Sequence, residues 1–421
     1  MGFKKHAAVS LNDVCKNITD GKHGDCKNQE NSGYYFVSVK DVFNGKINYE
    51  KARQITKEDF DQTHKRTQLE PNDILITNSG TIGRIALALE DEKTYKTTFQ
   101  KSVAIIKPFP EKVYPMYLYY YLINEIERLK VYAGGTTQKN LLLKDLRNFK
   151  VELHDIEYQK SISHFLSSLD EKIEINNQIN KKLEEMAQAI FKQWFVDFEF
   201  PNENGEPYKS SGGEMVESEL GMIPKGWEIK SLDEIAKFLN GLAMQKYRPA
   251  ENEKGIPVLK IKELRQGATD ESSDRCSENI DSKYVIQDGD VIFSWSGSLL
   301  VDLWCGGKCG LNQHLFKVTS TEYEKWFYYH WTKFHLAKFM SIAESKATTM
   351  GHIKRKDLSD SKVLIPSTET YKKANSIMES ILKKQVKTKV ESSRIGNIRD
   401  NLLPKLMSGE VRVPVPEEQP I

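Results

Sequence analysis

Two short turns in this chain carry small hydrogen-bonding residues in a form that could hold an anion. They are NSGTIGR (78–84) and WSGS (295–298). Tight glycine turns let backbone N–H groups approach a phosphate. The same residues also make ordinary hairpins, in which Ser and Gly only serve the turn. Both interpretations stay open, although the recurrence favours a shared role. The candidate nucleic-acid contacts in these turns are Asn78, Ser79, Thr81, Arg84, Trp295, Ser296 and Ser298.

Two further loops combine Thr-Thr with amide and basic side chains, namely GGTTQKN (134–140) and KATTMGHIKRK (346–356). Thr, Gln, Asn and Lys contact phosphates, and Gln, Asn and Arg also recognise base edges. The alternative is a solvated helix N-terminus that Thr caps. The candidate DNA contacts here are Thr136, Thr137, Gln138, Lys139, Asn140, Thr348, Thr349, His352, Lys354 and Arg355.

Two polar loops at matching places differ in sequence. Lys22 and His23 lie in one, and Gln245, Lys246 and Arg248 lie in the other. Divergence of this kind is expected of two domains that recognise different DNA sequences, but surface loops also diverge without such a cause.

Signatures of catalysis are missing from the sequence. It contains no GxxxxGK[ST], HExxH or GxSxG motif, no glycine-rich dinucleotide turn, and no Asn-Pro-Pro-aromatic tetrad of an amino-methyltransferase. A nuclease-type cluster has no fixed spacing and stays open. Cys305 and Cys309, with His314 nearby, could suggest a metal, but structural zinc needs four ligands and there is no second cysteine pair. We therefore expect a binding protein without a metal.

Composition sets broad limits. The 421 residues predict two or three domains, and 61 basic against 59 acidic residues give a net charge of +2. Any DNA-binding surface must therefore be local. No apolar run approaches a membrane span and no signal peptide is evident, so we expect a cytoplasmic chain with reduced cysteines.

The elements that must position these loops occur twice. DVIFSWSGS follows DILITNSGT by 217 residues (290 − 73), and TTMGHIKRKDL follows TTQKNLLLKDL by 212 residues (348 − 136). LDEIAKFLNG (232–241) likewise corresponds to LNDVCKNITDG (11–21). One long period of this kind indicates a duplicated molecule. The aromatic runs YLYYYL (117–122) and KWFYYHW (325–331) are expected to be buried faces of helices.

Each half is followed by a long helical stretch, 158–195 and 371–407. The first has no Gly or Pro in 38 residues and would extend about 57 Å. Its apolar residues follow a 3/4 alternation that passes through Asn176 and Asn180, typical of a coiled coil whose register is fixed by buried polar groups. We expect the two helices to run antiparallel. Their polar centre would pair with residues such as Lys384, Thr388 or Glu391.

The predicted fold class is mixed α+β, with two similar α/β domains and two long helices as a coiled-coil-like spacer. The expected parts are a first domain at 1–155, a helix at 156–197, a linker at 198–226, a second domain at 227–367, a helix at 368–408 and a flexible tail at 409–421. The linker is rich in Gly, Pro, Ser and Glu. A single long helix is expected over 114–133.

The chain resembles the specificity subunits of type I restriction-modification enzymes. The resemblance lies in FKQWFVDFEFP (191–201), PYKSSGGEMVESELGMIPKGWE (207–228) and LLPKLMSGEV (402–411), together with the repeated turns and loops. It implies two target-recognition domains, each reading half of a split DNA site, with the helices as a spacer. Helices of about 55 Å span roughly 16 base pairs, which fits two short half-sites and a gap.

The resemblance also implies partners. Two modification subunits would hold S-adenosylmethionine and methylate adenine, and restriction subunits would use ATP and Mg, so this chain would hold no cofactor and would not be an enzyme by itself. The helix ends are the expected docking site for these subunits, through Phe191, Trp194, Phe195, Leu402 and Leu406. Two alternatives remain: a non-catalytic coiled-coil scaffold or adaptor, and an orphan DNA-binding protein with two recognition domains.

Overall fold

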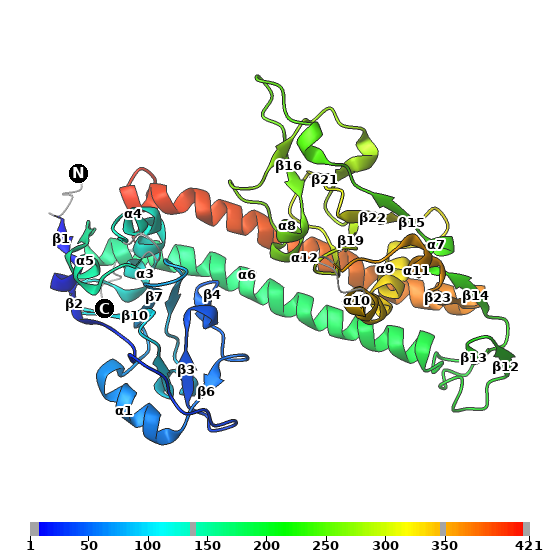
Figure 1. Ribbon diagram of the computed structural model, residues 1–421, viewed down its shortest axis with the longest axis horizontal. Helices are drawn as coiled ribbons and strands as arrows, with labels where there is room; N and C mark the ends of the chain where they lie inside the picture. The colour runs from blue at the N-terminus through cyan, green and yellow to red at the C-terminus, as the bar shows by residue number, and fades with distance from the viewer. Residues whose placement is uncertain (1–7, 135–139, 346–350, 416–421) are drawn as a thin grey trace. The chain divides into compact units, whose positions relative to one another are not determined.

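The computed structural model describes residues 8–134, 140–345 and 351–415 (Figure 1). The chain divides into two compact units. Unit 1 comprises Met1–Asp170 and Ile398–Ile421, and unit 2 comprises Glu171–Asn397. Two long helices, α6 (Ile156–Phe191) and α12 (Thr368–Ser408), contribute a segment to each unit. Each unit is described by itself below.

Unit 1 is built on a four-stranded antiparallel sheet in the order β2-β10-β7-β8, formed by Cys15–Asp20, Val103–Pro108, Ile74–Thr77 and Ile85–Leu87. All residues of β7 and β8 are buried, because α3 packs on one face of the sheet (Figure 1) and Leu75 and Ala86 belong to a second core cluster on the other face. A second sheet has the order β6-β3-β9, in which β3 and β9 are parallel. The remaining strands of this unit are β1 (Val9–Ser10), β3 (Tyr35–Val37), β4 (Val42–Phe43), β5 (Lys46–Ile47), β6 (Arg53–Gln54), β9 (Thr97–Phe99) and β11 (Lys150–Val151).

Unit 2 repeats this arrangement. Its four-stranded sheet has the order β15-β22-β19-β20, formed by Lys237–Asn240, Leu315–Thr319, Val291–Ser294 and Leu300–Leu303. The second sheet, β17-β16-β21-β18, contains a parallel pair at the equivalent place. The expected duplication is therefore confirmed at the level of strand order. The other strands are β14 (Glu228–Ser231), β16 (Ile256–Leu259), β17 (Arg275–Cys276), β18 (Val285–Ile286), β21 (Cys309–Leu311) and β23 (Lys362–Ile365).

The helix expected over 114–133 is two helices, α3 (Pro115–Asn124) and α4 (Ile126–Val131), which meet at Glu125. The prediction of one helix is wrong because the chain turns there, and Ile126 and Leu129 pack on the unit 1 core. Unit 2 has the same break between α9 (Lys325–Phe334) and α10 (Leu336–Ser345). Both aromatic runs lie in the cores, as predicted.

The remaining helices connect these elements along the chain. They are α1 (Lys57–Thr67), α2 (Glu92–Tyr95), α5 (Leu143–Asn148), α7 (Leu232–Ile235), α8 (Ile261–Gln266) and α11 (Arg355–Ser359), with the 3₁₀ turns η1 (Leu11–Val14), η2 (Val39–Asp41), η4 (Met244–Lys246) and η5 (Ser282–Tyr284). Thr56 caps α1 by accepting a hydrogen bond from the Asp59 N–H at 3.3 Å.

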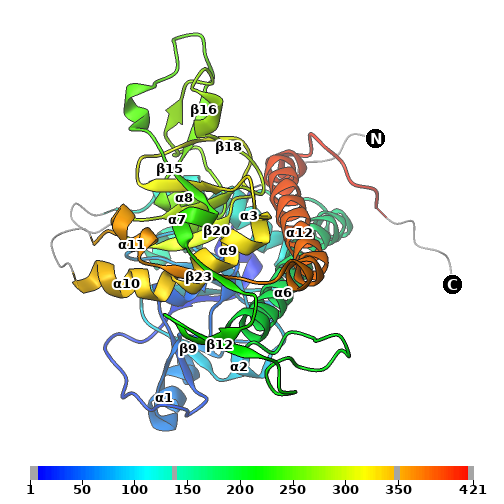
Figure 2. The same cartoon turned by 90° about the vertical axis from the view of Figure 1, so that its right-hand side faces the viewer.

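Within unit 2 the segments of α6 and α12 lie side by side and run antiparallel (Figure 2). Asn176 Nδ2 donates to Glu391 Oε2 at 3.0 Å, and Thr388 Oγ1 donates to Asn180 Oδ1 at 2.7 Å. These bonds confirm the predicted polar centre for Thr388 and Glu391. The third named partner, Lys384, instead accepts from Thr388 Oγ1 through its backbone carbonyl.

Within unit 1 the same two helices meet again. Arg399 of α12 bonds Asp170 of α6, and Tyr120 Oη of α3 donates to Asp170 Oδ2 at 2.6 Å. The α12 segment also supplies Leu403, Leu406 and Met407 to the unit 1 core. The helix is therefore part of the fold of this unit.

The segment after α6 is ordered by aromatic packing. A π-helical turn, η3 (Lys192–Val196), follows α6, and β12 (Met215–Ser218) pairs with β13 (Gly221–Pro224) as a hairpin. Phe200 stacks on Tyr208 at 4.5 Å and on Trp227 at 5.2 Å between ring centroids. The stretch expected to be a linker thus carries secondary structure and packs on the unit 2 core.

The side chains expected to dock partner subunits are engaged inside the chain. Phe191, Trp194 and Phe195 belong to the unit 2 core, and Phe195 is 0% exposed. Leu406 is also 0% exposed, and Leu402 packs against the same unit 1 core. Their apolar area is thus largely removed from water within the chain. A role of these helix ends in docking partner subunits stays a prediction.

The start of the expected flexible tail is also corrected. Val411 and Val413 pack against the unit 1 core, and the Val411 carbonyl accepts a hydrogen bond from Tyr158 Oη at 3.2 Å. The tail is therefore part of the packed structure through at least Val413.

Candidate nucleic-acid interface

In unit 1 the structure brings together four segments that are far apart in the sequence. Lys22 forms an isolated backbone β-bridge with Gln100, and Ser79 forms another with Asn140. The Asn78 N–H donates to the Ser102 carbonyl at 3.0 Å, and the Asn78 carbonyl accepts from the Leu141 N–H at 2.8 Å. We call the segments 21–22, 78–79, 100–103 and 140–141 the first loop frame.

Unit 2 contains the same construction from different residues. Leu242 bridges Asn312, and Ser296 bridges His352. The Trp295 N–H donates to the His314 carbonyl at 3.4 Å, and the Trp295 carbonyl accepts from the Ile353 N–H at 3.1 Å. We call the segments 241–242, 295–296, 312–315 and 352–353 the second loop frame. The repeated turn therefore lies beside Asn140 in unit 1 and beside His352 in unit 2.

Further backbone bonds match between the two frames. The Lys22 N–H donates to the Phe99 carbonyl at 2.8 Å, as the Leu242 N–H does to the Leu311 carbonyl at 2.9 Å. The Gln100 N–H donates to the Val37 carbonyl at 3.0 Å, as the Asn312 N–H does to the Leu259 carbonyl at 3.2 Å. Because backbone bonds do not depend on side-chain identity, the frame can stay fixed while its side chains change.

One glycine in each frame makes this geometry possible. A Cβ on Gly21 would lie 2.0 Å from the Phe99 carbonyl oxygen, and a Cβ on Gly241 would lie 2.2 Å from the Asn312 carbonyl oxygen. Both contacts are with backbone atoms that cannot move aside cheaply. Any side chain at these positions would push the loop away from its neighbour.

Most side chains on equivalent frame positions differ. The turn serine, Ser79 and Ser296, and the frame glycine, Gly21 and Gly241, are kept. The equivalent pairs that differ include Lys22 and Leu242, Asn78 and Trp295, Gln100 and Asn312, Ser102 and His314, and Asn140 and His352. Two identical backbone frames thus present different hydrogen-bonding groups.

The second frame carries a cluster of aromatic and polar rings around half-buried Trp295. Its indole Nε1 donates to Asn240 Oδ1 at 3.0 Å, which fixes the ring plane. His314 lies 6.1 Å and His352 6.3 Å from the Trp295 ring, measured between centroids. Ser296 Oγ lies 3.0 Å from His314 Nδ1. Such a cluster offers a planar surface for stacking and ring N–H groups for hydrogen bonds.

The predicted residues of the first half differ in their availability. Asn140 and Thr81 are exposed, Ser79 is half-buried, and Asn78 is buried. Asn78 Oδ1 has no hydrogen-bond partner among the described residues. Asn140 therefore combines the frame position with an accessible side chain.

Two basic residues of the first half are tied to acids. Lys22 Nζ lies 3.0 Å from Asp59 Oδ1, and this hydrogen bond raises the pKa of Lys22. His23 is exposed, with Nε2 at 3.5 Å from Asp20 Oδ2. Their net positive charge toward a phosphate is reduced by these partners.

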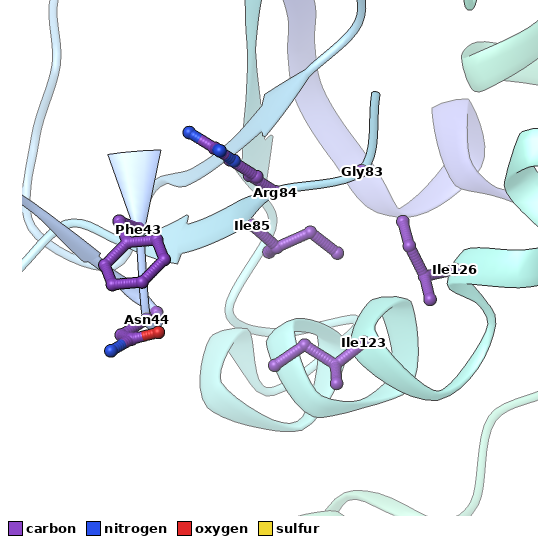
Figure 3. Close-up of a pocket in the computed structure, with 8 residues that line it drawn as sticks. Phe43, Asn44, Gly83, Arg84, Ile85, Ile123 and Ile126 are labelled. Atoms are coloured by element: carbon purple, nitrogen blue, oxygen red, sulfur yellow. The ribbon is translucent and has the colours of Figure 1, made fainter. Parts of the chain in front are cut away.

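Arg84 is not part of the frame and lines a shallow pocket of about 290 Å³ (Figure 3). Its Nη1 donates to the Val39 carbonyl at 2.9 Å, and its guanidinium lies 5.9 Å from the centre of the Phe43 ring. The pocket is lined by Phe43, Asn44, Gly45, Gly83, Arg84, Ile85, Ile123 and Ile126. These contacts hold Arg84 against the protein.

The predicted residues of the second half fall into two groups. Trp295, Ser296 and His352 belong to the frame, and Ser298 is exposed on the same turn. The other group lies outside the frame: Gln245, Lys246 and Arg248 are exposed after Leu242, while Lys354 and Arg355 begin α11. Arg355 Nη2 donates to the Phe238 carbonyl at 3.4 Å.

Six predicted residues lie outside the described ranges: Thr136, Thr137, Gln138, Lys139, Thr348 and Thr349. The flanking positions Asn140 and His352 are described, and both belong to a frame.

Sequence reasoning did not name several frame residues as DNA contacts, among them Gln100, Ser102, Asn312 and His314. The signal that could have found them is their place just before a repeated buried strand, β10 or β22. The sequences there, QKSVAIIK and NQHLFKVT, share too little to be aligned by eye.

Cys305 and Cys309, the cysteines weighed above as metal ligands, are free thiols in the core. Cys305 and Cys309 are buried, and burial raises the pKa of Cys305 to about 11 and that of Cys309 to about 12, so both are neutral thiols at pH 7. In the described part of the chain no group of three or more His, Cys, Asp or Glu is placed to hold a metal.

Among those same residues, no helix has the length and apolar character needed to cross a membrane.

Two equal α/β halves with matching frames, each joined to a long helix, define a duplicated recognition protein. A family model described as "Type I restriction modification DNA specificity domain" matches residues 4–185 and 224–392. The chain belongs to this family. That membership favours a specificity subunit over a scaffold.

Individual relatives agree with the family. The chain is 30% identical over 349 residues to the type I restriction enzyme MjaIX specificity subunit of Methanocaldococcus jannaschii, covering 81% of this chain and 78% of the relative. It is 24% identical over 365 residues to the HindI specificity subunit of Haemophilus influenzae, covering 73% and 80%. The crystal structure of a type I restriction-modification S subunit from M. genitalium has the same fold, with a TM-score of 0.52, 16% identity and 96% of each chain covered.

Proposed function

We propose that each unit of this chain recognises one half of a bipartite DNA target through its loop frame. The observation that carries this proposal is the pair of frames, which share the backbone bonds described above, the turn serine and the frame glycine but differ in most other side chains. A shared backbone frame docks on DNA in one way, while different side chains select different bases.

We further propose that the chain acts as the specificity subunit of a complex and performs no chemistry itself. Modification subunits would bind S-adenosylmethionine and methylate adenine, and restriction subunits would use ATP and Mg. This assignment is supported by family membership and by relatives named as specificity subunits of restriction enzymes. A cytoplasmic location follows from a DNA target.

The test is to co-express the chain with a candidate modification subunit and to map methylated adenines. Methylation at a two-part motif is the expected result. A stable complex that methylates at random, or not at all, would contradict the proposal.

A further inference from the structure

We propose that His314 is a specificity-determining residue of the second unit and that its Nε2–H donates to the N7 of a purine in the half-site. The equivalent position in the first unit, Ser102, would set the base preference of the other half-site. This inference rests on the proposed function and adds two contact positions to it.

The place of His314 in the fold favours this role. It lies just before β22, and its backbone is held on two sides: its carbonyl accepts from the Trp295 N–H at 3.4 Å, and its N–H donates to Asn312 Oδ1 at 3.2 Å. The side chain is half-buried. A fixed backbone with a partly accessible ring is the arrangement expected of a base contact, because little entropy is lost on binding.

A hydrogen bond to Ser296 orients the imidazole. Ser296 is 4% exposed, and its Oγ lies 3.0 Å from His314 Nδ1. The proposal assigns the serine hydroxyl as the donor to Nδ1, which leaves the ring proton on Nε2. In that tautomer the Nε2 edge of His314 is a hydrogen-bond donor.

Neighbouring rings restrict the orientation of this donor. Trp295 is tilted by 37° against His314, and Asn240 holds the indole through its Nε1. Trp295 also packs at 5.7 Å on Phe316, the second residue of β22. The imidazole is thus positioned by both the hydrogen bond and the indole. On the major-groove edge of DNA, a donor of this kind matches the N7 acceptor of guanine or adenine.

The first unit shows what changes when the ring is absent. Ser102 occupies the position of His314: its carbonyl accepts from the Asn78 N–H at 3.0 Å, as the His314 carbonyl accepts from the Trp295 N–H. The turn serine, Ser79, is still present, but there is no imidazole at this position for it to orient. The same backbone site therefore presents a short hydroxyl in one unit and a long, oriented donor in the other.

The experiment uses the full chain co-expressed with its modification subunits and a DNA library in which both half-sites are randomised. Three variants are compared with the unsubstituted chain: His314→Ser, His314→Gln and Ser102→His. His314→Ser is expected to reduce the preference at one base pair of one half-site by about 10- to 100-fold and to leave the other half unchanged. His314→Gln, which keeps a donor, should retain part of the preference. Ser102→His should change one base pair of the opposite half-site.

His164→Ser is the matched control, since His164 is exposed on α6 and lies outside both frames. It should leave the motif unchanged. An unaltered motif with His314→Ser would overturn the inference while leaving the proposed function intact. If His314→Ser does not fold, as judged by circular dichroism, the test rests on His314→Gln and Ser102→His. Unaltered motifs with both of these variants would overturn the inference about His314. Absence of two-part methylation with the unsubstituted complex would instead refute the proposed function, and this inference with it.

Discussion

Asn176 of α6 and Glu391 of α12 are joined by a 3.0 Å hydrogen bond in unit 2, and Asn176 is 1% exposed. The Asn176 Nδ2 donor finds this acceptor in one register only, because a shift by one turn would leave it buried without its partner. The Asn176 Oδ1 has no hydrogen-bond partner among the described residues.

Replacing this asparagine is expected to weaken the helix pair. Asn176→Ala should lower the free energy of unfolding by about 1 kcal/mol, since the bond is lost and Glu391 keeps access to water. Urea denaturation of the single variant, of Glu391→Gln and of the double variant measures the coupling. Asn177→Ala, on the exposed side of α6, is the control. Additive effects of the two substitutions would contradict this role.

A second polar contact ties α9 to both helices within unit 2. Lys333 bonds Glu184, which also accepts from Gln385 Nε2 at 2.9 Å. Burial alone would raise the pKa of Glu184, but the Lys333 ammonium and the hydrogen bonds outweigh it and lower the pKa to about 2.

Lys333→Met should therefore destabilise unit 2 by about 2–3 kcal/mol, because a partly buried carboxylate loses its cation. Adding Glu184→Gln should restore much of the loss. Lys387→Met, at an exposed position of α12, provides the comparison. The proposed coupling is wrong if the double variant is less stable than Lys333→Met alone.

Acid should destabilise unit 2 through two buried histidines. Burial lowers the pKa of His330 and of His335 to about 4 each, below the ordinary value of 6.5. The unfolded chain then binds protons that the folded chain excludes, so stability is full above pH 6.5 and falls as the pH drops toward 4.

Each histidine should contribute about 2–3 kcal/mol of this loss by pH 4.5, where Glu184 is still ionised. His335→Gln keeps a donor for the Lys362 carbonyl, which His335 Nε2 contacts at 2.8 Å, and removes one titration. Thermal unfolding from pH 4.5 to 7 should show a shallower slope for this variant. Equal slopes would contradict the assignment.

The buried helix-end residues should act on folding and not directly on subunit docking. Phe195→Ala should cost about 3–5 kcal/mol and Leu406→Ala about 2–5 kcal/mol, because each empties a core position. Assembly with modification subunits should fall only in proportion to the fraction unfolded. Loss of assembly by a fully folded variant would restore the docking role.

The two frame glycines offer a paired test of recognition. Gly21→Ala should impair recognition of one half-site and Gly241→Ala that of the other, since each Cβ would strike a backbone carbonyl within its own frame. Methylation of DNA carrying one altered half-site at a time measures this. Gly396→Ala meets no atom within 4 Å and lies in α12, so it should be neutral or slightly stabilising. An effect of Gly21→Ala on both half-sites would contradict independent frames.

The sequence by itself determined the duplication, the two long helices and the polar pairing of Asn176 and Asn180. These features depend on local periodicity and on motifs that recur at a fixed distance. It also predicted that the Ser-Gly turns and the Thr-Thr loops matter, and Ser79, Asn140, Ser296 and His352 do lie in the frames. That those frames contact DNA remains a proposal.

Only the tertiary structure decided which residues share a site. Ser102 and His314 join the frames through strand pairing between segments far apart in the chain, which no local pattern encodes. The structure also showed that Phe195 and Leu406 are core residues, because an apolar helix end looks the same in sequence whether its own chain or a partner covers it. Local order follows from neighbouring residues, whereas a recognition site depends on long-range contacts that close only when the whole unit folds.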